Sequence, residues 1–253
     1  MKFNTIKSIK YIMMSLLCGV IMSSYAEQQT ILLIADPKVL AVPITDNHEP
    51  MVDLKKQSDI AYGPSPEISN NTDYTKLRKT VYEKLKQAQA SLPQGLHFCL
   101  YEGYRSLQLQ KTLFDARFAK VKMEHPGRSR QQLFNETTKL VSPVVNFDGS
   151  KNIPPHATGG AIDVYLLNEK GEVVDMGIHP KDWMKDLNGS LSLTNSNVIS
   201  KEAKKYRQIM SDALNHVGFV NYPTEYWHWS YGDRYWAYNK HKSHAIYDSY
   251  TLN

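Results

Sequence analysis

The sequence predicts an α+β fold in a single domain, with helices packed on a largely antiparallel sheet around a central cleft. Two observations carry this prediction. Apolar residues recur at helical spacing in several segments, and short apolar runs bounded by turn residues lie between them. Because the 253 residues contain no internal repeat and no long low-complexity linker, we expect one sizeable hydrophobic core.

Four helices are expected. The first begins near Tyr74, where four apolar residues recur on one helical face: Leu77, Val81, Leu85 and Ala88. A second is expected to follow Ser106, and a third begins at Ser129, which has capping-box spacing to Gln132. Ser200 is expected to cap the last helix, with a core face formed by Tyr206, Ile209, Ala213 and Val217.

Strands are expected where apolar runs are short. Residues 96–101 predict a buried strand, and residues 161–167 predict another. Residues 169–172 have the composition of a hairpin turn leading into Val173-Val174. Residues 219–220 and 226–231 supply the last strands, so the sheet is expected to form mostly from the second half of the chain.

The N-terminus has the pattern of a secretory signal peptide. Three lysines, Lys2, Lys7 and Lys10, precede an apolar run over residues 11–22 and a small-x-small cleavage pattern at Ser24-Tyr25-Ala26. We therefore expect residues 1–26 to be removed and the mature protein to be periplasmic or secreted. An uncleaved anchor is the alternative, but no later stretch is long enough for stable membrane insertion.

The rest of the chain is expected to divide into an irregular segment, residues 27–72, and the folded domain, residues 73–253. Five prolines interrupt the first segment: Pro37, Pro43, Pro50, Pro64 and Pro66. Without residues 1–26 the formal net charge falls from +5 to +2, and no basic tract is present, so no nucleic-acid partner is expected. Cys99 is then the one cysteine left, which predicts a buried, inert thiol and no internal disulfide.

The first stretch with candidate metal-binding residues is residues 155–163. His156 and Asp163 are separated by Gly159-Gly160, and glycines allow the tight backbone turn that brings a loop histidine beside a strand carboxylate. Taken alone, this pair is equally well interpreted as a hydrogen-bonded structural pair.

The second stretch is residues 225–229. Glu225 and His228 are three apart, a spacing that shares one face on a helix but not on a regular strand. The flanking aromatic residues favour a strand, so a bulge or a turn is needed to direct both side chains to one side. A surface glutamate and a core histidine are the alternative interpretation. Together the two stretches supply three candidate zinc ligands, two histidines and a carboxylate, and a further carboxylate able to take a proton.

Arg105 follows the predicted strand over residues 96–101, where its guanidinium would reach a developing oxyanion or a substrate carboxylate. A solvated surface arginine is the alternative. His241 and His244 are better explained as part of a polar tail than as a second metal site. The sequence contains no serine nucleophile elbow, phosphate loop or dinucleotide fingerprint.

These motifs resemble those of the VanX-type D-Ala-D-Ala dipeptidases and the related VanY-type D,D-carboxypeptidases. Residues 156–163 resemble their His-x-x-Gly-x-Ala-x-Asp element, residues 225–228 their Glu-x-Trp-His element, and residues 102–105 their (Asp/Glu)-Gly-Tyr-Arg element. Met176-Gly177 and residues 229–237 are closer to the dipeptidase branch. The likeness extends from about residue 74 to residue 237.

The resemblance implies one zinc ion per chain, bound by His156, Asp163 and His228. It also implies that Glu225 is the catalytic base and that Arg105 stabilises the transition state. In such a site zinc polarises the scissile carbonyl and lowers the pKa of its water, while the base moves a proton from that water to the leaving amine.

Two departures from the family pattern concern the substrate. Pro154 occupies a position where the family usually has a serine, and residues 178–183 replace a Phe-Asp that follows Met-Gly. Asp182 is our candidate for the carboxylate that anchors the free amine of a dipeptide, and a solvated loop aspartate is the alternative. These changes leave the metal chemistry intact but put the strict preference for a dipeptide in doubt.

The sequence therefore predicts zinc-dependent hydrolysis of D-Ala-D-Ala, or of a related D-amino-acid dipeptide, in the periplasm. The first alternative is a D,D-carboxypeptidase that trims peptidoglycan stem peptides. The second is a non-catalytic module that binds zinc or cell-wall fragments, although such a module would need no base like Glu225. The expected partner is a small D-amino-acid peptide, and the sequence leaves the oligomeric state open.

Overall fold

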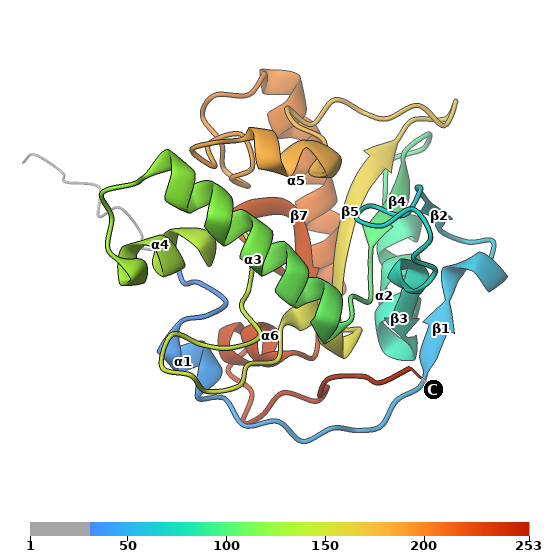
Figure 1. The fold of residues 1–253 in the computed structure, drawn as a ribbon. Helices are drawn as coiled ribbons and strands as arrows, with labels where there is room; N and C mark the ends of the chain where they lie inside the picture. Colours follow the sequence, from blue (N-terminus) through green and yellow to red (C-terminus); the bar gives the residue numbers. More distant parts are fainter. Residues whose placement is uncertain (1–30, 253) are drawn as a thin grey trace, which may run out of the picture. The chain divides into compact units, whose positions relative to one another are not determined.

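A five-stranded sheet lies at the centre of the fold, with the strand order β2-β4-β5-β7-β6 (Figure 1). This computed structural model describes residues 31–252. The strands of the sheet are β2 (Ala61–Tyr62), β4 (His97–Glu102), β5 (Ala161–Leu167), β6 (Val220–Tyr222) and β7 (Glu225–Ser230). β2 pairs with β4 in parallel, and the other neighbouring strands are antiparallel.

The sheet is therefore mixed, which corrects the expectation of a largely antiparallel sheet. The parallel edge strand β2 comes from the proline-rich segment that the sequence predicted to be irregular. It is only two residues long and both residues are exposed, so it carries no alternation of apolar and polar residues that a sequence pattern would reveal. A second, two-stranded sheet joins β1 (Met51–Asp53) to β3 (Lys76–Arg78) in antiparallel pairing.

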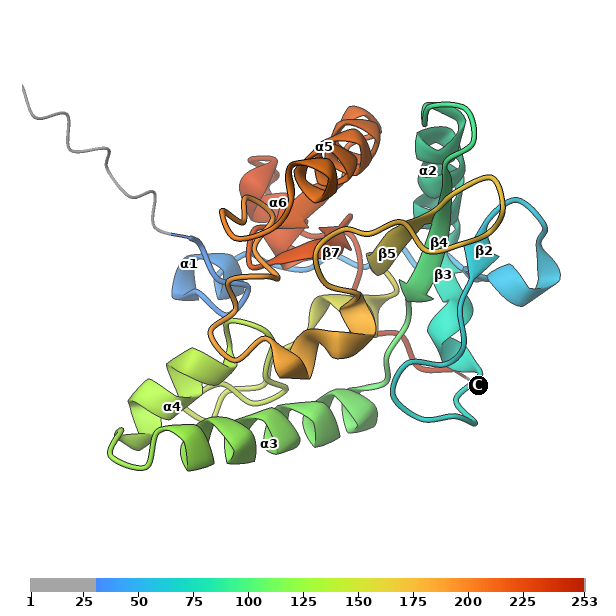
Figure 2. The same ribbon diagram turned by 90° about the horizontal axis from the view of Figure 1, so that it is seen from above.

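Helices cover both faces of the central sheet (Figure 2). The α-helices are α1 (Pro37–Leu40), α2 (Lys79–Ala90), α3 (Leu107–Glu124), α4 (Arg130–Thr137), α5 (Lys201–His216) and α6 (Arg234–Asn239). The 3₁₀ helices are η1 (Leu54–Lys56), η2 (Asp73–Thr75), η3 (Pro155–Thr158) and η4 (Pro180–Lys185). α2 and α5 lie on one face of the sheet, and α3 and α4 lie on the other. Among residues 31–252, no helix combines the length and the apolar character that crossing a membrane requires.

The hydrophobic core lies between the sheet and the pair α2 and α5. Three alternate residues of β5 are fully buried there: Ile162, Val164 and Leu166. They pack in one cluster with residues of α2 and α5 that include Val81, Leu85, Met210 and Leu214. Because side chains alternate along a strand, the same geometry turns Asp163 toward the opposite face, on the side of α3.

The predicted helix starts are confirmed for three helices. The hydroxyls of Ser106, Ser129 and Ser200 accept hydrogen bonds from the backbone amides of Leu109, Gln132 and Ala203, and Ser129 forms the complete capping box. The turn before Val173 forms as well, although Val173 makes only an isolated bridge to Leu167. Cys99 is buried, as expected.

Two details of the predicted helices are wrong. α2 begins at Lys79 rather than near Tyr74, because Leu77 belongs to β3 and pairs with Val52 of β1. The buried face of α5 includes Arg207 and Met210 in place of Ile209. The Arg207 guanidinium donates hydrogen bonds to three backbone carbonyls in the loops beside α5, so a charged residue takes a core position that an apolar pattern cannot predict.

Arg78, which is fully buried, connects three distant parts of the chain. Its guanidinium donates hydrogen bonds to the carbonyl oxygens of Glu49, Thr158 and Asp248, at 2.7, 2.8 and 3.1 Å. These carbonyls belong to the N-terminal segment, to η3 and to the C-terminal segment. Residues 1–26, the predicted signal peptide, lie outside the described residues.

We predict that Arg78→Met lowers the free energy of unfolding by about 3 kcal/mol, because three buried carbonyls lose their donor while the side-chain volume is retained. Urea denaturation followed by circular dichroism measures this change. The matched control is Arg128→Met at an exposed ion pair with Glu136, which we expect to change stability by less than about 0.5 kcal/mol. Equal denaturation midpoints for the two variants would contradict the assigned role of Arg78.

Candidate metal centre and active site

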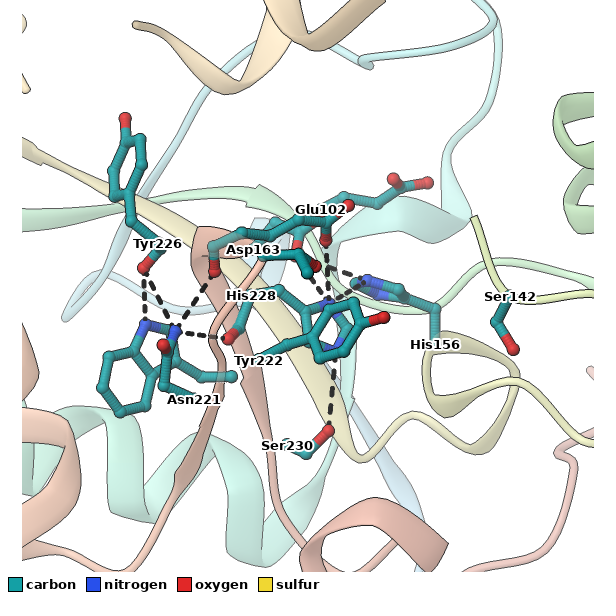
Figure 3. A network of polar contacts seen from close by, with 12 residues as sticks. Glu102, Ser142, His156, Asp163, Asn221, Tyr222, Tyr226, His228 and Ser230 are labelled. Atoms are coloured by element: carbon teal, nitrogen blue, oxygen red, sulfur yellow. Dashed lines mark hydrogen bonds and ion pairs between the residues drawn. The ribbon is translucent and has the colours of Figure 1, made fainter. Parts of the chain in front are cut away.

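Three potential metal ligands converge on the α3 side of the sheet. The Nε2 atom of His156 lies 3.1 Å from Nδ1 of His228 and 3.4 Å from Oδ1 of Asp163, and Nδ1 of His228 lies 3.1 Å from the same oxygen. The three side chains point toward one another (Figure 3), and all three are buried. The structure thus brings together the three residues that the sequence proposed as ligands.

The register of the sheet places Asp163 between two other polar residues. Asp163 on β5 is paired directly with His228 on β7 and with Glu102 on β4. Directly opposed residues on neighbouring strands have their side chains on the same face and about 5 Å apart. A one-residue slip of either strand would therefore remove a partner of Asp163 from the site.

His156 comes from η3, immediately before β5. Gly159 ends η3 in the left-handed region, with φ of 70°, and lets the chain turn directly into the strand. The ring of His156 is fixed by its second nitrogen, because Nδ1 donates a hydrogen bond to the carbonyl oxygen of Gly103 at 2.7 Å. A carbonyl oxygen only accepts, so in the neutral ring Nε2 is the unprotonated nitrogen and carries the free lone pair.

A bulge in β7 brings Glu225 and His228 to the same site. Asn221 pairs with Trp229 while the next residue of β6, Tyr222, pairs with Glu225, so the residues between Glu225 and Trp229 have no counterpart on β6. The Asn221 amide occupies this gap and donates to the carbonyl oxygens of Glu225 at 3.1 Å and His228 at 3.0 Å (Figure 3). The prediction that a bulge or turn must accompany the Glu-x-x-His spacing is confirmed.

Glu225 lies beside the three converging atoms. Its Oε2 is 3.9 Å from Nδ1 of His228, and its side chain is buried. Burial, together with the nearby negative charge of Asp163, raises the pKa of Glu225 well above its usual range. The Glu225 carboxylate therefore has a greater affinity for protons than an exposed carboxylate.

The pKa values of two ligand candidates are shifted toward the forms that bind metal. Burial raises the pKa of Asp163, but its interactions with His156 and His228 outweigh this effect and hold the pKa below its usual range. Burial lowers the pKa of His228. Asp163 is thus held ionised and His228 neutral, the states in which each coordinates a cation.

Arg105 is held on the edge of the same site. Its Nε donates to Oε1 of Glu102 at 3.0 Å, and one terminal nitrogen pairs with the second oxygen of that carboxylate. The other terminal nitrogen donates to Oε1 of Gln110 at 2.9 Å. Although burial lowers the pKa of Arg105, the charge of Glu102 outweighs it and raises the pKa, so the guanidinium stays charged.

The three candidate ligands, Glu225 and Arg105 line one pocket, which other parts of the chain complete. Its walls include Gln110 and Leu113 from α3, Pro180 and Trp183 from η4, and Ile34 and Glu67 from the N-terminal segment. Burial, followed by repulsion from Glu102, raises the pKa of Glu67 to about 7.

Asp182 is not brought to this pocket. Its carboxylate pairs with Lys185 at 2.6 Å within η4, and the neighbouring residue Trp183 is the one that lines the wall. The side chain of Lys185 is 78% exposed, so this pair faces solvent. The placement does not support the expected role of Asp182 as the anchor of a substrate amine.

Sequence reasoning missed the roles of three residues in the site. Glu102 belongs to the motif that identified Arg105, and its spacing of three from that arginine was an available signal. Asn221 gave no signal, because its importance depends on the bulge. Glu67 also gave none, because its segment carries no recognisable motif.

The donor set fits a zinc ion. Ligand atoms about 2.0–2.1 Å from a tetrahedral zinc are separated from one another by about 3.3 Å. The separations of 3.1–3.4 Å between Nε2, Nδ1 and Oδ1 agree with this value. Two imidazoles and one carboxylate leave the fourth tetrahedral position for water or substrate, the arrangement of catalytic zinc sites.

We predict that the metal-free protein binds about one zinc ion per chain, with a rise in melting temperature, because a ligand that binds only the folded state stabilises it. His156→Ala should abolish stoichiometric binding. The control is His97→Ala, since the His97 side chain is exposed and hydrogen-bonds to Gln89. Zinc content by atomic emission after gel filtration measures the difference, and retention of zinc by His156→Ala would contradict the assigned site.

We predict that Asn221→Asp weakens zinc binding by at least about tenfold. A carboxylate cannot donate hydrogen bonds to the two carbonyls of the bulge, so the side chains of Glu225 and His228 lose their orientation. Competition with a zinc-sensitive dye measures the affinity. Asn239→Asp serves as the control, since the Asn239 amide also donates to a backbone carbonyl, that of Tyr235, away from the site. Equal affinity in the two variants would show that the bulge does not depend on Asn221.

The sequence of this chain matches a known protein family. Residues 69–247 match the Peptidase_M15 family of D-ala-D-ala dipeptidases. A D-alanyl-D-alanine dipeptidase from Synechocystis sp. is 28% identical over 225 residues, which is 81% of this chain and 91% of that protein. Among solved structures, VanYB in complex with D-Alanine-D-Alanine is 15% identical, with 81% and 93% of the two chains covered and a TM-score of 0.41.

The LdcB LD-carboxypeptidase is 16% identical, with 78% and 76% of the two chains covered and a TM-score of 0.34. The family match alone spans most of the chain and includes every residue of the converging cluster. The chain therefore belongs to the Peptidase_M15 family of D-Ala-D-Ala dipeptidases and is a metallopeptidase.

Proposed function

We propose that this protein hydrolyses D-Ala-D-Ala, or a closely related D-amino-acid dipeptide, with zinc as its cofactor. The observation that carries the proposal is the Glu225 carboxylate next to three converging ligand atoms in one buried pocket. His156, Asp163 and His228 would hold the ion. When bound there, zinc supplies a Lewis acid for the scissile carbonyl and lowers the pKa of its water.

Glu225 is the base of the proposed mechanism. It takes a proton from the attacking water and delivers it to the nitrogen of the leaving amino acid. Its raised pKa suits both steps, because the carboxyl group retains the proton long enough to act as the acid. A cation held by His156, Asp163 and His228 would oppose this shift and favour the ionised form of Glu225 before reaction.

Arg105 stabilises the negative charge that develops on the carbonyl oxygen. Glu102 and Gln110 both hold its guanidinium in place before substrate binds, so little reorganisation is needed during the reaction. The bidentate pair with Glu102 also fixes the plane of the guanidinium, which a lysine at this position would not reproduce.

The dipeptide substrate is favoured over a long peptide by the pocket walls. Ile34 and Glu67, from the N-terminal segment, line the pocket together with residues of α3 and η4, so parts of the chain outside the sheet complete its walls. The related protein from Synechocystis is named as a D-alanyl-D-alanine dipeptidase, which agrees with this choice. A D,D-carboxypeptidase that acts on N-blocked stem peptides is the second candidate.

We also propose that the protein acts after export, in the periplasm or outside the cell. The support for this is the charged, apolar and small-residue pattern of residues 1–26. Dipeptides released from peptidoglycan would be met in that compartment. Mass spectrometry of the N-terminus of protein recovered from the periplasm tests the proposal.

We predict that the zinc-loaded protein lacking residues 1–26 releases D-alanine from free D-Ala-D-Ala and much less from N-acetyl-D-Ala-D-Ala. Glu225→Gln should bind zinc normally but lose at least about 10³-fold in kcat, because the water then has no base. Chromatographic quantification of D-alanine measures both results.

Three other outcomes would change the assignment. Preferential cleavage of the acetylated peptide would identify a carboxypeptidase. No cleavage of either substrate, with zinc bound, would favour a binding module. Undiminished hydrolysis by Glu225→Gln would contradict the proposed base.

A further inference from the structure

The loop of residues 63–72, between β2 and η2, carries a carboxylate into the active-site pocket. That carboxylate belongs to Glu67, which is partly buried and lies among the pocket-lining residues together with Arg105 and the metal-ligand candidates. Glu67 is separated by more than 30 residues from every other acidic residue of the pocket, so only the fold brings it there.

The loop is fixed at both ends to the strand that leads to Arg105. At its start, the amide of Gly63 donates to the carbonyl of Leu100 at 3.1 Å, and the hydroxyl of Tyr74 donates to the carbonyl of Gly63 at 2.7 Å. After its end, the amide of Gly103 donates to the carbonyl of Tyr74 at 2.6 Å. The position of Glu67 therefore depends on that of β4 and of the residues that lead to Arg105.

Within the loop, two further bonds restrict the backbone next to Glu67. The hydroxyl of Ser65 donates to the carbonyl of Ile68 at 2.6 Å, and the amide of Asn71 donates to the same carbonyl at 2.8 Å. Glu67 lies inside this turn. The carboxylate thus extends from a defined backbone rather than from a long unsupported segment.

Glu67 is partly buried and has no ion-pair or hydrogen-bond partner within residues 31–252. The one arginine of the pocket, Arg105, is already paired with Glu102. Two other carboxylates, Asp163 and Glu225, line the pocket with Glu67. A divalent metal ion offsets two of these three negative charges, which leaves the capacity to bind one further positive charge.

A free dipeptide has such a charge close to the scissile bond. Its α-ammonium group lies only one residue from the carbonyl that is attacked, whereas an N-acylated peptide has a neutral amide there. We propose that the Glu67 carboxylate binds the α-ammonium group of the substrate and makes Glu67 the residue that selects free dipeptides over N-blocked peptides. This inference rests on the proposed peptidase function and assigns the amine-binding role to Glu67 instead of Asp182.

The first test compares the kinetics of Glu67→Gln with those of the unmodified protein, both loaded with zinc. Loss of the ionic hydrogen bond should lower kcat/KM for free D-Ala-D-Ala by about 10- to 100-fold. The value for N-acetyl-D-Ala-D-Ala should stay within about twofold. Glu67→Asp keeps the charge and should recover part of the loss, which a change in folding or in zinc content would not do.

The control variant is Asp115→Asn, which removes one negative charge from an exposed ion pair with Lys111 on α3. It should leave both kcat/KM values unchanged, so that a general effect of net charge is separated from the effect of Glu67. Asp182→Asn is measured in parallel. A loss confined to the free dipeptide in Asp182→Asn, with none in Glu67→Gln, would overturn the inference in favour of Asp182.

The second test measures binding without turnover and so separates this inference from the proposed reaction. In the Glu225→Gln background with zinc bound, calorimetry should detect D-Ala-D-Ala, and adding Glu67→Gln should weaken its binding by about 10-fold or more. N-acetyl-D-Ala-D-Ala should bind weakly to both proteins. If the unmodified protein fails to cleave the dipeptide but this difference in binding persists, the reaction is wrong and the amine site stands.

Equal binding of the free dipeptide with and without Glu67→Gln would overturn the amine site whatever the hydrolysis assay shows. Failure of the Glu225→Gln protein to bind the free dipeptide at all would overturn it too, because an ammonium site must then be absent. Equal losses for the free and acetylated substrates would show that Glu67 supports the pocket without recognising the amine.

Discussion

The concentration of negative charge around Asp163 is the constraint on which the rest of the structure depends. Glu102 and Asp163 face one another across neighbouring strands, and Glu225 follows on the next strand, all three buried. Burying charges without partners costs several kcal/mol for each ion. Arg105 compensates for Glu102, and the two histidines that surround Asp163 complete a set that favours a divalent cation. Sheet register, the bulge in β7 and the loop after β4 all serve to hold this arrangement.

Each element of the site is fixed by contacts outside the pocket. η3 is held through its Thr158 carbonyl by Arg78, and the ring of His156 is held by the carbonyl of Gly103. The bulge that directs Glu225 and His228 depends on a single amide, that of Asn221. Such outer contacts orient ligand side chains, so that a site assembled from loops and strand ends has converging ligand atoms.

The features that the sequence could predict are those encoded locally. Serine caps at Ser106, Ser129 and Ser200 are read from adjacent residues, and the three residues that converge in the pocket belong to motifs of four to eight residues. The sequence also required a bulge at Glu225 and His228, because the spacing of three does not fit a regular strand. In each case the residues that determine the local structure lie within about eight positions of one another in the sequence.

The features that escaped prediction depend on contacts distant in sequence. β2 is too short to show a pattern, and the core position of Arg207 depends on three carbonyls supplied by separate loops. Asp182 lies near the position in the chain where the family has the carboxylate that anchors the substrate amine. An ion pair with Lys185 nevertheless holds its side chain toward solvent. Glu67 enters the pocket from a segment without any motif, which only the three-dimensional arrangement reveals.

The C-terminal segment lies against the same elements that support the metal ligands. The amide of Tyr250 donates to the carbonyl of Ala157 in η3 at 2.8 Å, and its own carbonyl accepts from the hydroxyl of Tyr104 at 2.7 Å. The ring of Tyr250 also lies over the guanidinium of Arg78. An affinity tag or fusion partner joined at this end would disturb the contacts of Tyr250 with η3, the helix that carries His156. Recombinant forms intended for metal or substrate measurements should therefore carry their tags at the other end.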